Sequence, residues 1–314
     1  MIDSNHYRWG SSHLVFATAV LLGGGNFVAV RFSNQELDPT WGAALRFSVA
    51  AILFIGIVTV LRLRWPRGRV LALNLLFGLL STAIFYALMY WALDRVTAGV
   101  ATVVMAIVPL VTLLLAAAHG TEMLRGRAVI GSLLAFGGIA WMTLGSSELV
   151  LPLPALAALL AAALAVSESV IIGKKLSGNH PAMTNAVGIG SGAVVLLAMS
   201  ALNGDTWALP AQPEAAWSIL YLVTLGSVGL FVLILLVVRQ WTASATSYMF
   251  VLFPVVTLLL EAWLLDEPIT LRAVAGAVVV MSGVWFGALS PASRVDDDRA
   301  GLEVAAAAPE AAAG

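Results

Sequence analysis

Residues 97–141 read TAGVATVVMAIVPLVTLLLAAAHGTEMLRGRAVIGSLLAFGGIAW, and residues 242–286 read TASATSYMFVLFPVVTLLLEAWLLDEPITLRAVAGAVVVMSGVWF. Shifted forward by 145 residues without a gap, the first stretch matches the second at 15 of 45 positions. Two unrelated segments of so apolar a composition would match at roughly a tenth. The most informative identities are Pro109 with Pro254, Glu122 with Glu267, Arg127 with Arg272, Gly131 with Gly276 and Gly138 with Gly283. Self-similarity at a fixed offset indicates a chain built from two copies of one unit.

The composition places this chain in a membrane. Hydrophobic residues make up 61% of it and charged residues 11%, against roughly 25% charged residues in ordinary soluble domains. Apolar runs of about 20 residues recur along the chain, and each is long enough to cross a hydrocarbon core of roughly 30 Å as a helix. We therefore predict an all-α, polytopic membrane protein whose immediate surroundings are the lipid bilayer.

Ten transmembrane helices are predicted, at approximately 13–31, 40–61, 70–92, 97–117, 126–145, 151–172, 182–202, 215–237, 243–264 and 271–289. The predicted organisation is an N-terminal segment (1–12), a first five-helix repeat (13–145), a second five-helix repeat (151–290) and a tail (291–314). The tail is rich in Asp, Ala and Gly. Such a composition buries too little apolar surface to fold, so we predict that it is disordered.

The distribution of cations predicts how the two repeats lie in the membrane. Of the 16 Lys and Arg residues, 12 fall at the termini and in the even-numbered links, 3 fall in the opposite links, and Arg46 lies within the second span. Basic residues stay cytoplasmic, so both termini are predicted to be inside. Because five helices is an odd number, the two copies must enter the membrane in opposite directions. Inverted repeats of this kind are typical of secondary transporters, whose substrate sites lie between the halves.

Several classes of site are disfavoured by the sequence. The chain has no Cys, which excludes disulfides, thiolate metal sites and cysteine nucleophiles. Its four His residues lack metal-ligand spacing, and no Walker-type phosphate loop is present. Basic residues are not interleaved with aromatic ones, which argues against a nucleic-acid partner. We expect no cofactor, no bound metal and no catalytic constellation, so we do not interpret the chain as an enzyme.

The repeated residues resemble the drug/metabolite transporter superfamily, in particular its EamA type with two tandem domains. The family pattern is a proline in the fourth helix of each domain, an apolar run, a glutamate, and a helix with spaced glycines. Residues 265–276, LDEPITLRAVAG, are the closest match, and Pro39 followed by Arg46-Phe47 is a second family feature. With Tyr86, Tyr90 and Trp91 in the third span, the chain is similar to the YddG-like exporters of aromatic amino acids. The resemblance implies a transporter in a bacterial inner (plasma) membrane that works by alternating access.

Three tyrosines are candidates for the substrate cavity. Tyr86 and Tyr90 are four residues apart, so they share one face of a helix, well inside the third span. Tyr248 lies inside the ninth span. A tyrosine hydroxyl at that depth requires a hydrogen-bond partner, which a substrate or a neighbouring helix can provide. The alternative is that these residues are purely structural.

A second group of candidates lies in the first helix of each repeat. Asn26 and Glu168 are related by an offset of 142, the same offset that places Pro39 on Pro181. Polar groups inside a bilayer are costly unless they face the bundle interior. Glu168 with its neighbour Ser167 is therefore predicted to bind substrate, to couple transport to a proton, or to clamp two helices. Arg46 is expected to extend toward the outer interface instead.

The prolines, glycines and glutamates of the repeat have structural interpretations. Pro109 and Pro254 lie mid-span, where proline removes a backbone hydrogen bond and kinks a helix. They are candidates for gating points, with a fixed shape role as the alternative. The repeated glycines predict close helix packing, either within the chain or across a homodimer. Glu122 and Glu267 are expected to cap or pair at the membrane edge.

The predicted function is a secondary transporter that exports small amphipathic metabolites, with aromatic or other apolar amino acids as the leading substrates. A first alternative keeps the mechanism and changes the substrate to drugs, carboxylates or nucleotide sugars. The others are a channel, which needs a more polar lining than these spans offer, and a membrane enzyme or other integral membrane protein that does not transport.

Overall fold

The computed structural model describes residues 4–93, 95–96, 101, 104–143, 152–264 and 270–289, which form helices joined by short turns with no strand among them. The first half contains α1 (Ser4–Ser33), α2 (Pro39–Val60), α3 (Gly68–Gly78), the π-helical turn η1 (Leu79–Ile84), α4 (Phe85–Leu93), α6 (Val108–Ala118) and α7 (Gly126–Thr143). Helix α1 thus begins well before the predicted start of the first span, within the segment that was predicted as a separate N-terminus.

The second half repeats this order. It contains α8 (Leu153–Lys175), α9 (Pro181–Asn203), α10 (Pro213–Val223), the π-helical turn η2 (Thr224–Gly229), α11 (Leu230–Gln240), α12 (Ala243–Ser247), α13 (Met249–Leu264), α14 (Leu271–Val284) and the π-helical turn η3 (Trp285–Leu289). Proline opens α9 and α10, as it opens α2, because its missing N–H costs nothing in the first turn of a helix. The predicted tail, 291–314, lies outside the described residues.

Eight stretches of the described chain are long and apolar enough to cross a membrane, which supports the prediction of a multi-pass membrane protein. They correspond to eight of the ten predicted spans. The predicted fourth and fifth spans occur as shorter apolar helices, Val108–Ala118 and Gly126–Trp141. A turn at residues 106–107 interrupts the fourth span just before Pro109, and residues adjoining both helices lie outside the described part of the chain.

The boundaries of the elements reproduce the sequence repeat. Helices α2 and α9 begin 142 residues apart, whereas α3 and α10, η1 and η2, and α7 and α14 all begin 145 residues apart. The two copies therefore fold alike, including a π-helical turn at the same place in the third helix of each. Such turns are rare and are frequent at functional sites.

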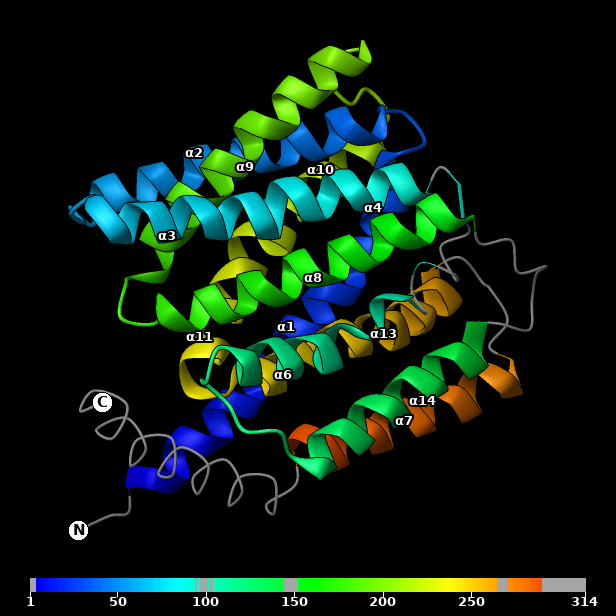
Figure 1. The fold of residues 1–314 in the computed structure, drawn as a ribbon. Helices are drawn as coiled ribbons and strands as arrows, with labels where there is room; N and C mark the ends of the chain where they lie inside the picture. The colour runs from blue at the N-terminus through cyan, green and yellow to red at the C-terminus, as the bar shows by residue number, and fades with distance from the viewer. Residues whose placement is uncertain are drawn as a thin grey trace.

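The contacts between helices also obey the repeat. Helix α2 packs on its copy α9 at one edge of the molecule, and α7 packs on its copy α14 at the other (Figure 1). Between these pairs, α1 contacts α13, α10 and α11, whereas its copy α8 contacts α6, α3 and α4. Each of these contacts of α1 with the second half is matched by the equivalent contact of α8 with the first half, and α1 and α8 lie at the centre.

Helices α7 and α14 cross closely through the repeated glycines. A Cβ atom on Gly138 would lie 2.8 Å from the carbonyl oxygen of Gly276, and one on Gly131 would lie 2.7 Å from that of Gly283. The two helices therefore run antiparallel, with their backbones in contact. This confirms the prediction of close packing. These glycines contact one another within one chain, and a homodimer stays a prediction.

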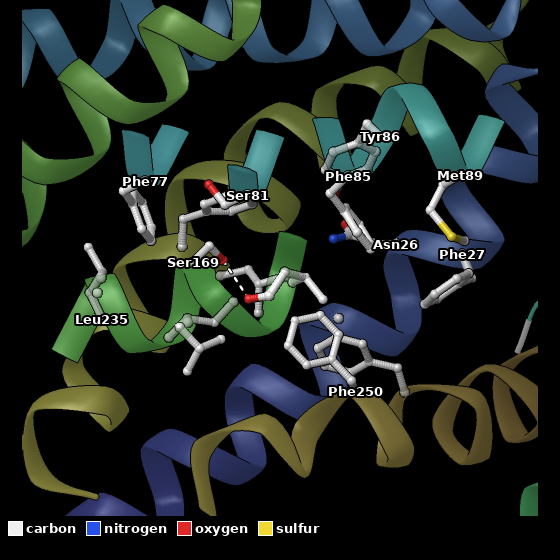
Figure 2. Close-up of a pocket in the computed structure, with 18 of the residues that line it drawn as sticks. Asn26, Phe27, Phe77, Ser81, Phe85, Tyr86, Met89, Ser169, Leu235 and Phe250 are labelled. Atoms are coloured by element: carbon white, nitrogen blue, oxygen red, sulfur yellow. Dashed lines mark hydrogen bonds between the residues drawn. The ribbon is translucent and has the colours of Figure 1, made fainter. Parts of the chain in front are cut away.

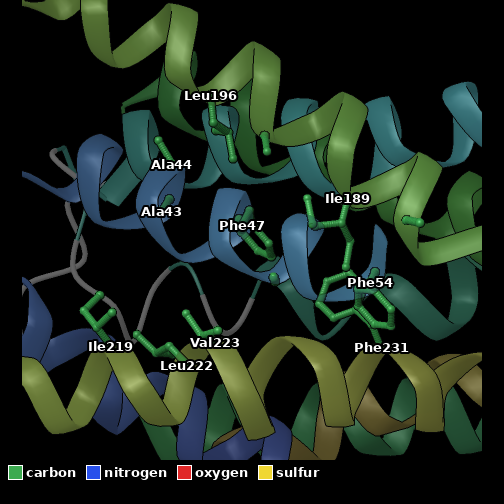
Figure 3. Close-up of a cluster of buried hydrophobic side chains, with 14 of the residues drawn as sticks. Ala43, Ala44, Phe47, Phe54, Ile189, Leu196, Ile219, Leu222, Val223 and Phe231 are labelled. Carbon is green, nitrogen blue, oxygen red and sulfur yellow. The ribbon is translucent and has the colours of Figure 1, made fainter. Parts of the chain in front are cut away.

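The largest apolar cluster joins α2, α9, α10 and α11 (Figure 3). Phe47 and Phe54 of α2 pack in it with Ile189 of α9 and Phe231 of α11. The rings of Phe47 and Phe231 meet edge to face, with centroids 6.0 Å apart. This cluster fixes α2 and thereby positions Arg46, the residue beside Phe47.

Two acidic side chains link loops to helices. Glu36 accepts hydrogen bonds from the backbone N–H groups of Ala211 and Gln212, just before α10. Glu122 accepts from the N–H of Ser244, at 3.1 Å, and from its hydroxyl. The prediction of a capping role is confirmed for Glu122, which holds the start of α12, while Glu267 lies outside the described residues.

Candidate functional site

A cavity of about 170 Å³ lies between the two halves (Figure 2). Its walls come from α1, α3, η1 and α4 of the first half and from α8, α11 and α13 of the second, with Arg46 contributed by α2. Asn26 and Tyr86 lie on one side of it and Phe250 on the other. The walls are mostly apolar, and their rings include Phe27, Phe85, Tyr86, Tyr90, Phe250 and Phe253. A dry cavity of roughly 150 Å³ accommodates benzene, so this one has room for an aromatic group.

Arg46 is the charged residue of the cavity wall. Its side chain is 2% exposed. Its Nε donates to Ser227 Oγ at 2.8 Å and its Nη2 donates to the carbonyl oxygen of Gly226 at 3.1 Å. The guanidinium carbon lies 4.6 Å from the ring centre of Phe47 and 5.7 Å from that of Tyr86. The prediction that Arg46 extends to the outer interface is therefore wrong, because neutral partners hold it inside the bundle.

No acidic side chain of the described chain lies within ion-pair distance of Arg46, whose partners are a hydroxyl, a carbonyl group and aromatic rings. A buried cation without a counter-charge is costly and strongly attracts an anion. The cavity therefore presents a positive charge in apolar surroundings, which favours a ligand with a negative group.

The π-helical turn η2 provides the partners of Arg46. The carbonyl oxygen of Gly226 accepts from Arg46 and also from Asn26 Nδ2, at 3.1 Å in each case. Gly226 also allows this approach by its lack of a side chain, since a Cβ there would overlap Asn26 Oδ1. Asn26 Oδ1 is buried without a hydrogen-bond partner and belongs to the cavity wall. Asn26 thus lies beside the cation in the cavity wall, with its Oδ1 packed against Gly226.

The predicted site residues separate into two groups. Asn26, Tyr86 and Tyr90 line the cavity, and the two tyrosine rings lie with their centroids 6.2 Å apart. Ser167 and Glu168 are not part of its lining, although the next residue, Ser169, is. The Ser169 hydroxyl donates to the carbonyl oxygen of Val166 at 2.7 Å, the contact drawn in Figure 2.

Ser167 and Glu168 contact the first half of the chain at other places. Ser167 Oγ donates to the carbonyl oxygen of Val108 at 3.3 Å, and Glu168 Oε1 lies 3.6 Å from His119 Nε2. Both contacts join α8 to α6 or to the residue after it. In this conformation these side chains therefore link the two halves rather than line the cavity.

Tyr248 also lies outside the cavity lining. It is buried at the break between α12 and α13, where its hydroxyl donates to the carbonyl oxygen of Ala128 at 2.8 Å and lies 3.0 Å from Ser132 Oγ. Its partners on α7 satisfy the hydroxyl, so a structural role accounts for this tyrosine in the conformation seen here.

The two repeated prolines lie near interruptions of their helices. Pro109 is in the first turn of α6, directly after the turn at residues 106–107. Pro254 lies inside α13, whose first residue follows the break at Tyr248. A role of either proline in gating stays a prediction.

Sequence reasoning missed the partners of Arg46. A signal was present, because Gly226 and Ser227 stand 145 residues after Ser81 and Thr82, so small and polar residues recur at matched positions inside two apolar spans. Ser81 itself lines the cavity. Among the described residues, no group of His, Asp and Glu side chains has an arrangement that could hold a metal ion.

The chain is similar to known proteins both in sequence and in fold. A model of the EamA-like transporter family matches the chain twice, over residues 10–144 and 153–288. The chain is 27% identical over 282 residues to an "uncharacterized transporter" of Archaeoglobus fulgidus, a match covering 87% of this chain and 97% of that protein. It is 28% identical over 264 residues to a "probable terminal-alkyne amino-acid exporter" of Streptantibioticus cattleyicolor, covering 80% and 85%. A solved crystal structure shares the fold, with a TM-score of 0.74 and 19% identity, covering 89% and 97%.

Proposed function

We propose that this chain, which belongs to the EamA-like transporter family, is a secondary transporter that exports small amphipathic metabolites, above all apolar and aromatic amino acids. The observation that carries the proposal is Arg46, a buried cation without a carboxylate partner among the described residues, in the wall of an apolar and aromatic cavity. The name of the relative from Streptantibioticus cattleyicolor supports an amino acid as the substrate class.

The polar groups of the cavity match the two charges of an amino acid. The guanidinium of Arg46 is suited to the carboxylate, because hydrogen bonds between ionised groups are the strong ones. Asn26 lies beside Arg46 in the wall, and its Oδ1, which has no hydrogen-bond partner, would accept from the ammonium group once the side chain turns toward the cavity. Rings such as Tyr86, Tyr90 and Phe250 then surround the side chain, and an aromatic pair adds about 0.5–1.5 kcal/mol beyond the area that it buries.

The mechanism of transport would follow from the opposite orientations of the two halves in the membrane. We propose ten spans in two inverted repeats, with both termini on the cytoplasmic side of a bacterial inner membrane, so that the cavity opens alternately to each side. The antiparallel crossing of α7 and its copy α14 supports opposite orientations of the copies. The excess of cations in the even-numbered links supports the orientation in the membrane.

The test is counterflow of tritiated L-phenylalanine in proteoliposomes, since a carrier is stimulated by substrate on the opposite side. Phenylpropionate, which lacks the ammonium group, and phenylethylamine, which lacks the carboxylate, serve as competitors. We expect phenylalanine to compete best. A second candidate function is transport of other carboxylates, for which Arg46 alone provides the recognition. Competition by phenylpropionate that is as strong as competition by phenylalanine would favour this second candidate.

The decisive variant is Arg46→Gln. Loss of a hydrogen bond to a charged group costs about 1.5–3 kcal/mol, so phenylalanine affinity should fall roughly 10- to 150-fold. Arg64→Gln, an exposed residue between α2 and α3, is the matched control and should leave affinity unchanged. Size-exclusion chromatography checks that both variants fold. Wild-type affinity in Arg46→Gln, or no counterflow of any amino acid by the wild type, would contradict the proposal.

A further inference from the structure

The substrate cavity extends from its polar groups into an apolar arm. Arg46 and Asn26 belong to the polar part of the wall. The arm is the part of the cavity that is lined by Phe77 of α3, by Val170 and Gly173 of α8, and by Leu235 and Val238 of α11. Apart from the glycine, these residues pack in one apolar cluster. Figure 2 shows Phe77 and Leu235 at one side of the cavity and Asn26 toward the other.

Two serines line the cavity between Phe77 and Asn26 (Figure 2). The hydroxyl of Ser169 donates to the carbonyl oxygen of Val166 at 2.7 Å, and Ser81 Oγ lies 3.4 Å from Thr82 Oγ1. Both hydroxyls thus have partners in the protein. The arm beyond them offers a ligand apolar contacts rather than hydrogen bonds.

The helices beside the arm indicate its length. On α11 the lining residues extend from Leu230 to Val238, and on α8 they extend from Val166 to Gly173. At a rise of about 1.5 Å per residue, these stretches are roughly 12 Å and roughly 10 Å long. An extended hydrocarbon chain with C–C bonds of about 1.5 Å advances about 1.3 Å per carbon, so the arm has the length of roughly six to eight carbons. A benzyl group is shorter and leaves the far end unfilled.

The arm is narrow where it passes Gly173. A Cβ atom on this glycine would lie 3.5 Å from Phe77 Cε2 and 3.6 Å from Leu235 Cδ2. Carbon atoms in contact are about 3.5–4.0 Å apart, so the space between the glycine and these two side chains is about one carbon atom wide. An unbranched chain of methylene groups fits such a gap, whereas a ring or a branch does not.

Packing does not explain why residue 173 is a glycine. Gly78 and Gly188 allow two helices to approach, because a Cβ on Gly78 would overlap the backbone of Gly188. The Cβ on Gly173 would make only ordinary contacts, and its backbone has no positive φ. Alanine would also favour a helix interior such as that of α8 more than glycine does. What the glycine provides is the open gap.

We propose that Gly173 determines which side chains the cavity accepts, and that the preferred substrates are amino acids with an unbranched apolar side chain of roughly six to eight carbons. The transport of these compounds rests on the proposed function, whereas their binding in the arm does not. Burial of one more methylene group should raise affinity about fourfold until the arm is full.

The experiment measures binding without transport, through the rise in the thermal unfolding midpoint of the purified protein in detergent, because a ligand that binds the folded state stabilises it. The ligands are L-norvaline, L-norleucine, L-α-aminooctanoate and an isomer of aminooctanoate with a branched chain end. We expect the half-saturating concentration to fall about fourfold per methylene, or roughly 60-fold from norvaline to aminooctanoate. The branched isomer should bind more weakly than aminooctanoate.

The decisive variant is Gly173→Ala, whose methyl group fills the gap without a clash. It should bind aminooctanoate no better than norvaline, a loss of roughly 60-fold for the longer ligand. Gly190→Ala is the matched control, because its Cβ lies in α9 and meets only Ala51, at 4.0 Å. This control should retain the full dependence on chain length. Size-exclusion chromatography checks that both variants fold.

Each outcome separates the arm from the proposed function. Equal binding of norvaline and aminooctanoate by the wild type, or a wild-type dependence on chain length in Gly173→Ala, overturns the inference, even if phenylalanine counterflow is observed. A dependence on chain length that Gly173→Ala removes supports the arm, and the absence of counterflow would then refute the proposed function alone. If none of these amino acids stabilises the wild type, both are wrong.

Discussion

Arg46 shows how one residue can be held at a place where its charge is expensive. A charged side chain at the centre of a bilayer costs about 2.5–3.5 kcal/mol on insertion scales. Two hydrogen bonds and two ring faces offset part of this cost without neutralising the charge. A structural role alone would be met by an apolar residue of similar volume. We interpret the retained charge as part of the substrate site.

At the same scale, Tyr86 and Tyr248 allow a direct comparison between a tyrosine that lines the cavity and one that holds two helices together. Because Tyr86 lines the cavity, Tyr86→Ala should weaken phenylalanine binding by about 0.5–1.5 kcal/mol beyond the lost area, roughly two- to twelvefold. Tyr248→Phe removes hydroxyl contacts to α7 and should reduce stability by about 0.5–1.5 kcal/mol with affinity unchanged. Thermal unfolding and a binding assay on both variants test this contrast, which equal effects on affinity would contradict.

Asp38 is expected to make the link between the α1–α2 turn and the α9–α10 connection sensitive to acid. Hydrogen bonds from the backbone and the hydroxyl of Thr206 hold the pKa of Asp38 below its usual value of 3.8. A lowered pKa in the folded state contributes stability that is fully present above the usual value and is lost as pH falls through the folded one. The link between the α1–α2 turn and the α9–α10 connection should therefore weaken only in strong acid.

The matched variants for this prediction are Asp38→Asn and Glu214→Gln, the latter an exposed carboxylate in the first turn of α10. Thermal stability of the purified protein is measured from about pH 2 to about pH 7, a range that extends below the usual carboxylate pKa values. We expect Asp38→Asn to reduce the acid dependence and Glu214→Gln to retain it. If Asp38→Asn keeps the acid dependence of the wild type, groups other than Asp38 cause the loss of thermal stability in acid.

At the scale of elements, each half places a π-helical turn at the same position in its third helix. In the described part of the chain, η2 directs a carbonyl group to the cavity cation, whereas η1 contributes Ser81 to the lining. The two turns thus give a pseudo-symmetric cavity two chemically different walls. This asymmetry suits a zwitterion, which has one end of each charge.

The close crossing of α7 and α14 predicts that a large side chain at Gly138 destabilises the protein, and the neighbouring Gly137 provides the control. A Cβ atom on Gly138 would meet Gly276 and Val280, whereas one on Gly137 would meet no atom within 4 Å. Gly138→Leu should destabilise the protein by about 1–3 kcal/mol, the usual cost of overpacking, and Gly137→Leu should be tolerated. Thermal unfolding in detergent measures both variants. Equal destabilisation by the two would show that helix propensity, not the crossing, explains the loss.

At the scale of the whole molecule, the inverted arrangement is tested at two matched loops. Arg67 precedes α3 and Gln212 precedes α10, exactly one repeat offset of 145 apart, and both side chains are exposed. The chain has no Cys, so single substitutions give clean labels. With an impermeant maleimide, Arg67→Cys should react from the cytoplasmic side alone and Gln212→Cys from the outside alone. Labelling of both from one side would exclude opposite orientations.

The sequence by itself determined the membrane class, the two copies and the family. Apolar runs, turn residues and a repeat such as Pro109 with Pro254 are local signals that add up along the chain, so they survive without knowledge of tertiary contacts. The repeated glycines likewise predicted close packing. The sequence also placed Asn26, Tyr86 and Tyr90 in the candidate site, and all three line the cavity.

Only the tertiary structure decided which side chains of each helix face the cavity. Successive residues of an α-helix point about 100° apart. A span that is apolar all round gives no contrast from which to read its rotation. Ser169 therefore faces the cavity, whereas its neighbour Glu168 contacts His119, 49 positions earlier in the chain. Arg46 points inward because η2, from the other half, provides its partners, and no pattern within its own helix encodes that contact.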